Sequence, residues 1–206
     1  MAEGLAYGSL LSLLWTPLVA VTASLEGRGN GQIAVSAHGA SIVPDRPRVL
    51  VQLYKTNLTH DLVLQSGAFA LNFLREDQID LAHALGFVSG RDTDKLSDIA
   101  HSFGSTGSPL LDDCLGWVDC RVINTMDGGD MTCFLADVLE GRLISPSQPL
   151  WWREMRQQMQ SAWQEEWHRK IAGEIDISRR TMDSIAPPQP IAFASIRGPQ
   201  GIIDQG

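Results

Sequence analysis

Residues Asn30–Ala37, which read NGQIAVSA, join a glycine-rich segment directly to a run of small and hydroxyl-bearing side chains. Upstream, Leu18–Ser24 (LVAVTAS) is apolar and β-branched, as expected for a buried strand. Between them, Glu26–Gly31 contains three glycines and an asparagine, which predicts the turn of a β-hairpin. Glycines let a backbone approach a ligand closely, so exposed N–H groups there could meet an anion or a ring heteroatom. A hairpin without a ligand is the alternative interpretation.

Length and composition indicate one globular domain with additional terminal segments. The chain has 206 residues, of which 44% are hydrophobic, so it can bury a sizeable core. Its formal net charge of -8 argues against nucleic acid as a partner, because nucleic-acid-binding proteins usually carry a basic face. The three cysteines lack the paired spacing of a zinc site. They predict reduced thiols in a cytoplasmic protein rather than a disulfide scaffold.

The N-terminal segment raises the question of a signal peptide or a membrane span, because residues 4–25 carry no charge. The preceding residues include Glu3 but no lysine or arginine, and Pro17 interrupts the apolar run. These features do not fit either kind of segment. We expect a short helix that leads into the first strand, and no contact with a membrane.

Periodicity predicts a mostly β body with connecting helices. We expect strands over 48–54, 68–74, 116–123 and 131–139, with a tight turn at 127–130, and helices over 61–65 and 76–85. Thr59 is the expected N-cap of the first of these helices, and Gly67 its end.

The segment Lys55–Thr59 brings together a lysine, several hydroxyl groups and the start of a helix. A cation and unpaired backbone N–H groups are what an anionic phosphate needs. The alternative is a capped helix beside a solvated lysine.

The composition changes after Pro149, where four of the six tryptophans lie. Residues at helical spacing of three and four predict one long amphipathic helix: Trp152, Met155, Met159, Trp163, Trp167 and Ile171. We expect this helix to pack on the β body or on a partner subunit, with an aromatic ligand site as the alternative. The chain thus divides into a body (1–145), a Trp-rich helical extension (146–185) and an arm or tail rich in proline and glycine (186–206).

Several kinds of catalytic site are absent from the sequence. Gly27, Gly29 and Gly31 do not match the dinucleotide fingerprint, because a strand follows where a helix is required. There is no Walker loop and no Gly-x-Ser-x-Gly elbow. The five histidines are isolated in sequence, so we expect no metal site. No catalytic residue can be named on these patterns.

The motifs, taken in order, resemble those of the flavin reductase-like, FMN-binding split-barrel family. The resemblance covers about Trp15 to Gly141 and is carried by six segments, which are 22–24 with 31–36, 41–44, 54–59, 69–74 and 90–95. It implies a split β-barrel of mainly β structure with connecting helices, forming a homodimer that binds FMN, or FAD, near the subunit interface. The implied function is that of a flavin-binding oxidoreductase, with NAD(P)H or a redox protein as its partner.

Motif matching also implies which residues hold the flavin. Asn30, Gly31, Gln32, Ile33 and Ala34 would present backbone groups to the isoalloxazine ring. Ser36, Ala37 and Ser41 would lie near the ring or the ribityl chain. The phosphate would be bound by Lys55, Thr56, Asn57 and Thr59, and Lys95 would close the site.

The chain departs from the family pattern at one turn. Members that reduce free flavin with NAD(P)H typically carry Gly-Asp-His before the last barrel strands, whereas this chain has Gly129-Asp130-Met131. Methionine cannot supply an imidazole, so this difference argues against turnover of NAD(P)H. It does not argue against flavin binding. Two alternatives therefore remain beside a flavin reductase: a flavoprotein that carries electrons or flavin without NAD(P)H turnover, and a cofactor-free split-barrel interaction module.

Overall fold

The computed structural model describes residues 8–185, so the predicted tail (186–206) lies outside the described residues. The strands are β1 Val19–Leu25, β2 Arg28–Ala34, β3 Ala37–Gly39, β4 Arg48–Tyr54, β5 Ala68–Phe73, β6 His101–Phe103, β7 Pro109–Leu111, β8 Gly116–Asp127 and β9 Met131–Leu143. The helices are α1 Gly8–Leu11, α2 Leu58–Ser66, α3 Ile79–Phe87, α4 Trp152–Gln158 and α5 Ser161–Thr181, with 3₁₀ turns η1 at Ser12–Leu14 and η2 at Met182–Ser184.

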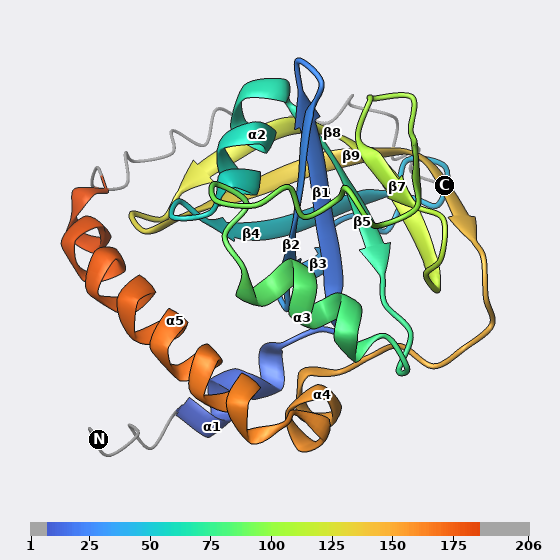
Figure 1. The fold of residues 1–206 in the computed structure, drawn as a ribbon. Helices are drawn as coiled ribbons and strands as arrows, with labels where there is room; N and C mark the ends of the chain where they lie inside the picture. Colours follow the sequence, from blue (N-terminus) through green and yellow to red (C-terminus); the bar gives the residue numbers. More distant parts are fainter. Residues whose placement is uncertain (1–7, 186–206) are drawn as a thin grey trace, which may run out of the picture.

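Seven strands form one antiparallel sheet in the order β2-β1-β5-β8-β9-β4-β3. The sheet curls on itself, with α2 at one end and α3 beside the first strands (Figure 1). Its two ends approach each other just after β2, where the backbone N–H of Gln52 donates to the carbonyl of Ser36 at 3.2 Å. This arrangement confirms the predicted split barrel with connecting helices.

The hairpin between β1 and β2 is tighter than the sequence predicts. Its turn consists of Glu26 and Gly27 alone, both with positive φ (51° and 81°), the geometry that a two-residue hairpin requires. The prediction of a turn through Gly31 is therefore wrong, because Gly31 lies within β2 and pairs with Thr22. A side chain at Gly31 would come within 3.1 Å of Leu85, so this glycine allows α3 to pack closely on the strand.

The strand β1 is buried on both faces, which explains its continuous apolar sequence. Val19, Val21 and Ala23 belong to the core inside the barrel, which α2 covers. Leu18 and Ala20 point to the opposite face and belong to a second core under α3 and α4. Because successive side chains of a strand point to opposite faces, β1 contributes to two hydrophobic layers at once.

The helix α2 begins earlier than predicted and ends where expected. Its N-cap is Asn57 rather than Thr59, and it stops at Gly67 in the left-handed conformation (φ 67°). The Thr59 side chain lies inside the first turn and accepts a hydrogen bond from Asn30 Nδ2 at 2.8 Å. Its hydroxyl therefore connects the helix to β2 instead of capping it.

The Trp-rich extension forms two helices instead of the single long helix predicted. Met159 and Gln160 adopt extended backbone (ψ 130° and 154°) between α4 and α5. The break allows Met159 to be buried while α5 turns to cross one side of the body (Figure 1). There, Trp163 stacks on His83 of α3, with ring centroids 4.0 Å apart. Between residues 8 and 185, no helix has the length and apolar character needed to span a membrane.

Candidate functional site

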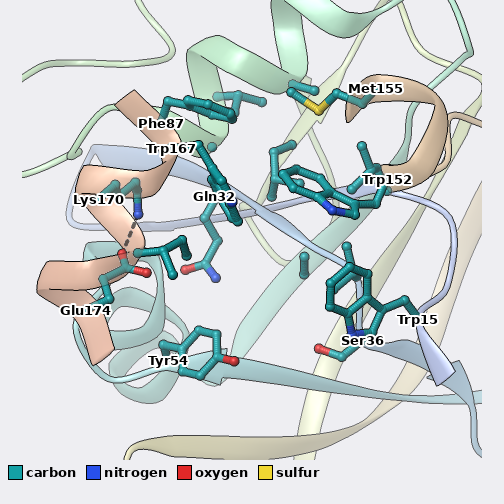
Figure 2. Close-up of a pocket in the computed structure, with 18 of the residues that line it drawn as sticks. Trp15, Gln32, Ser36, Tyr54, Phe87, Trp152, Met155, Trp167, Lys170 and Glu174 are labelled. Carbon is teal, nitrogen blue, oxygen red and sulfur yellow. Dashed lines mark hydrogen bonds and ion pairs between the residues drawn. The ribbon is translucent and has the colours of Figure 1, made fainter. Parts of the chain in front are cut away.

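A cavity of about 700 Å³ lies between the barrel and the C-terminal extension. Its walls come from the end of β2, from β4, from α3 and from the facing sides of α4 and α5. Figure 2 shows Trp15 and Trp152 at one end and the Lys170–Glu174 pair at the other, with Trp167 and the amide of Gln32 between them. The size is within the range of about 300–1,000 Å³ that is typical of small-molecule sites.

One end of the cavity is aromatic. Trp152 contacts Trp15 edge-to-face, with centroids 6.3 Å apart, and lies 4.6 Å from Trp167. Trp167 in turn lies 5.3 Å from Phe87 of α3. All four side chains line the cavity, together with Met155. Such a surface suits a flat, largely apolar ligand, because aromatic rings provide a large contact area at a small entropic cost.

The other end is polar and continues into a smaller cavity of about 170 Å³, which we call the annex. The annex is lined by Asn30, Gln32, Thr56, Asn57, Leu58, Phe87, Ser89, Gly90, Lys95, Lys170 and Glu174. Two buried side-chain oxygens, Gln32 Oε1 and Thr56 Oγ1, have no hydrogen-bond partner within the described part of the chain. Buried polar groups are normally satisfied, so these two oxygens lack a partner of the kind that a bound ligand supplies.

Lysines make this end of the cavity electropositive. Lys95 donates to the carbonyl of Leu85 at 2.7 Å, and burial, with a smaller contribution from the charge of Lys170, lowers the pKa of Lys95 to about 8. Lys170 itself forms an ion pair with Glu174 one turn along α5. On the opposite wall, burial and then the charges of Asp130 and Glu174 raise the pKa of Tyr54, which keeps its hydroxyl protonated.

The structure brings together part of the predicted site. Eight of the predicted residues line the cavity or the annex: Asn30, Gln32, Ile33, Ala34, Ser36, Thr56, Asn57 and Lys95. The other five, Gly31, Ala37, Ser41, Lys55 and Thr59, do not line either space. Lys55 forms an ion pair with Asp127 at 2.6 Å, and Ser41 Oγ accepts from the N–H of Val43 at 3.0 Å.

The helix α5 contributes more to this site than its sequence predicts: an aromatic ligand site on its Trp167 and Ile171 face was the less favoured alternative, and Lys170 and Glu174 were not predicted. Trp167, Lys170, Ile171 and Glu174 all line the cavity. Their spacing of three, four and seven residues places them on one face of the helix. That pattern is visible in the sequence, but without the fold it cannot be assigned to a cavity wall.

Comparison with known proteins gives the site its context. Residues 11–160 match the family model described as flavin reductase like domain. The chain is 30% identical over 135 residues to the high molecular weight rubredoxin of Moorella thermoacetica, an alignment that covers 65% of this chain and 58% of that protein. It is 27% identical over 135 residues to the ferric-chelate reductase (NAD(P)H) of Archaeoglobus fulgidus, covering 65% of this chain and 79% of that protein. The chain therefore spans little more than half the length of the first of these relatives.

A solved structure with similar architecture is that of an FMN-binding protein from Thermus thermophilus with bound p-hydroxybenzaldehyde. The TM-score is 0.58 at 30% sequence identity, and the match covers 62% of this chain and 71% of that one. The matched segment of the family model extends over all nine strands and well over half of the sequence. The chain therefore belongs to the flavin reductase like domain family.

Proposed function

We propose that this chain binds a flavin in the 700 Å³ cavity and acts as a flavin-dependent oxidoreductase. The observation that carries the proposal is the pair of buried, unpartnered oxygens, Gln32 Oε1 and Thr56 Oγ1, at the polar end of an aromatic-walled cavity. An amide oxygen accepts from a ring N–H, and a hydroxyl donates to a phosphate. A flavin mononucleotide carries both groups.

The residues present fit such a ligand. The aromatic end, with Trp152 and Trp167, suits an isoalloxazine ring, and Gln32, Ala34 and Ser36 would hold the ring edge. Thr56, Asn57 and Lys95 would hold the phosphate. The flavin, when bound, supplies the electron-transfer chemistry, while the protein binds it, orients it and excludes water. Among the relatives, one is named a ferric-chelate reductase and the Thermus structure is titled an FMN-binding protein, which supports the proposal.

A flavoprotein without NAD(P)H turnover is the second candidate, and a contact at the 128–130 turn favours it. Met131 stands at the end of that turn and does not line the cavity. The turn is covered by η2: a Cβ added to Gly129 would lie 2.5 Å from the carbonyl oxygen of Met182. A nicotinamide approaching this turn would meet backbone of the C-terminal extension.

We further propose that the protein is a homodimer in the cytoplasm. The three cysteines, Cys114, Cys120 and Cys133, are buried and unpaired, which suits a reducing compartment. Burial raises the pKa of Cys114 to about 11 and that of Cys120 to about 12, so these thiols pack as apolar side chains.

Spectroscopy of the purified protein tests the first proposal. We expect a flavin absorbance spectrum, either as isolated or after adding FMN. Gln32→Leu should weaken flavin binding by about tenfold, the effect of losing one buried hydrogen bond, while Gln65→Leu on the exposed side of α2 should leave it unchanged. A protein that stays colourless with both FMN and FAD would refute the proposal. Anaerobic mixing with NADH or NADPH then separates the two candidates, because only a reductase bleaches the flavin band at catalytic rates.

A further inference from the structure

The helix α5 contributes to the cavity although it lies outside the segment that defines the family. The family model ends at residue 160, and α5 spans Ser161–Thr181. Trp167, Lys170 and Glu174 nevertheless line the cavity, and the last two also line the annex. This chain therefore completes its site with a helix that the shared domain does not provide.

The ion pair on α5 is directed at the annex. Figure 2 shows Lys170 and Glu174 facing inward beside Gln32. Their side chains are only 21% exposed, so the pair is largely removed from water. Lys95 lines the annex from the other side, and Thr56 Oγ1 has no partner there. Two ammonium groups, one carboxylate and a free hydroxyl thus surround a small space.

With two positive charges and one negative charge, the annex favours the binding of one small anion. A phosphate could bind Lys170 in place of Glu174 and also accept a hydrogen bond from the Thr56 hydroxyl. Charge-assisted hydrogen bonds to phosphate are among the stronger ones. The annex measures about 170 Å³, well below the sizes of about 300 Å³ or more that enclose drug-sized ligands. It can enclose a phosphate group, but it does not enclose the additional adenosine monophosphate of a flavin dinucleotide.

Resting on the proposed function, we propose that Lys170 and Glu174 form a phosphate cap that makes this chain select FMN over FAD. In the cap, Lys170 binds the terminal phosphate in place of Glu174. Glu174 holds Lys170 in position when no phosphate is bound and competes with the ligand for it.

The cap predicts opposite effects for its two members. Removing the charge of Lys170 removes a phosphate ligand, so FMN should bind more weakly. Neutralising Glu174 removes both the competitor for Lys170 and a repulsive charge, so FMN should bind more tightly. If the pair served only to stabilise α5, both variants would instead change FMN affinity in the same direction.

The experiment is a titration of the flavin-free, full-length protein with riboflavin, FMN and FAD, followed by quenching of flavin fluorescence. The variants are Lys170→Met, which keeps the length of the side chain, and Glu174→Gln. Arg169→Met is the matched control, because Arg169 is the exposed neighbour of Lys170 on the same helix. Thermal unfolding of each variant monitors the fold.

We expect the wild-type protein to bind FMN at least about tenfold more tightly than either riboflavin or FAD. Lys170→Met should weaken FMN binding several-fold, with Thr56, Asn57 and Lys95 still holding the phosphate, and leave riboflavin binding unchanged. Glu174→Gln should strengthen FMN binding several-fold, and Arg169→Met should change nothing.

Equal affinities for FMN, FAD and riboflavin would overturn the cap while leaving flavin binding intact. So would weaker FMN binding in Glu174→Gln. If Lys170→Met fails to fold, the Glu174→Gln variant and the comparison of the three ligands still test the phosphate cap. Failure of all three ligands to bind would instead refute the proposed function itself.

Discussion

Lys95 is the residue whose charge state should control phosphate binding near neutral pH. Its pKa is lowered to about 8, chiefly by burial and then by Lys170. The other ionisable groups that line the annex are Lys170 and Glu174, both from α5. A phosphate dianion favours the protonated amine, so FMN binding is coupled to proton uptake once the pH exceeds the pKa.

FMN affinity should therefore fall as the pH rises through about 8, by up to about tenfold per pH unit. Titrations between pH 6.5 and 9.5 by fluorescence quenching measure this slope. Riboflavin, which has no phosphate, serves as the ligand control, and Lys95→Met should remove the slope for FMN. An equal slope for riboflavin would contradict the assignment.

Individual site residues were predictable to different degrees. Thr56 and Asn57 directly precede α2, and Gln32 lies within β2; all three belong to motifs that carry the family resemblance, and all three line the cavity or the annex. Lys55 was expected beside the phosphate for the same reason, but its side chain pairs with Asp127 across the strand end. Which carboxylate a flexible lysine contacts depends on the register of β4, β8 and β9, and a linear sequence does not contain that information.

At the scale of elements, the contact between the 128–130 turn and η2 should be important for stability. Gly129 has φ 88°, and a Cβ there would lie 2.5 Å from Met182 O. Gly107 has a similar φ of 84° with nothing within 4 Å of an added Cβ. Replacing each glycine by alanine therefore distinguishes the cost of backbone strain, present at both positions, from the cost of a steric clash, present only at Gly129.

Gly107→Ala should lower the free energy of unfolding by about 1 kcal/mol, from strain alone. Gly129→Ala should cost about 2–3 kcal/mol, because η2 must also move. Urea unfolding followed by circular dichroism gives both values. Equal losses in the two variants would show that the contact with η2 contributes nothing.

The elements themselves were largely predictable, because their periodicities are strong. The strands β4, β5, β8 and β9 occur where apolar and β-branched residues alternate, although β8 and β9 extend further than expected. The hairpin turn was predicted but drawn too long, through Gly31, and the break at Met159–Gln160 was not predicted. Both are set by packing against distant residues: Gly31 accommodates Leu85, and burial of Met159 fixes where α4 ends.

At the scale of the whole molecule, the cavity couples ligand binding to global stability. Its walls come from both ends of the described chain, with Trp15 on one side and Trp167 on the other. A ligand that binds only this folded arrangement stabilises every element that contributes to it.

FMN at about 100 times its Kd should add about 2.7 kcal/mol to the free energy of unfolding. For a chain of this length that raises the melting temperature by about 5–10 °C. Differential scanning fluorimetry with riboflavin, FMN and adenosine monophosphate measures the shift. Adenosine monophosphate should give no shift, and an unchanged melting temperature with FMN would contradict binding at this cavity.

The break at Met159–Gln160 coincides with the end of the segment that the family shares. The barrel and α4 fall within the shared family segment, and α5 follows immediately after it. Two extended residues at this boundary set α5 apart from the family segment, so substitutions on the cavity face of this one helix should change ligand preference without altering how the sheet folds. Grafting other helices after residue 160 would be a direct route to redesigning the pocket.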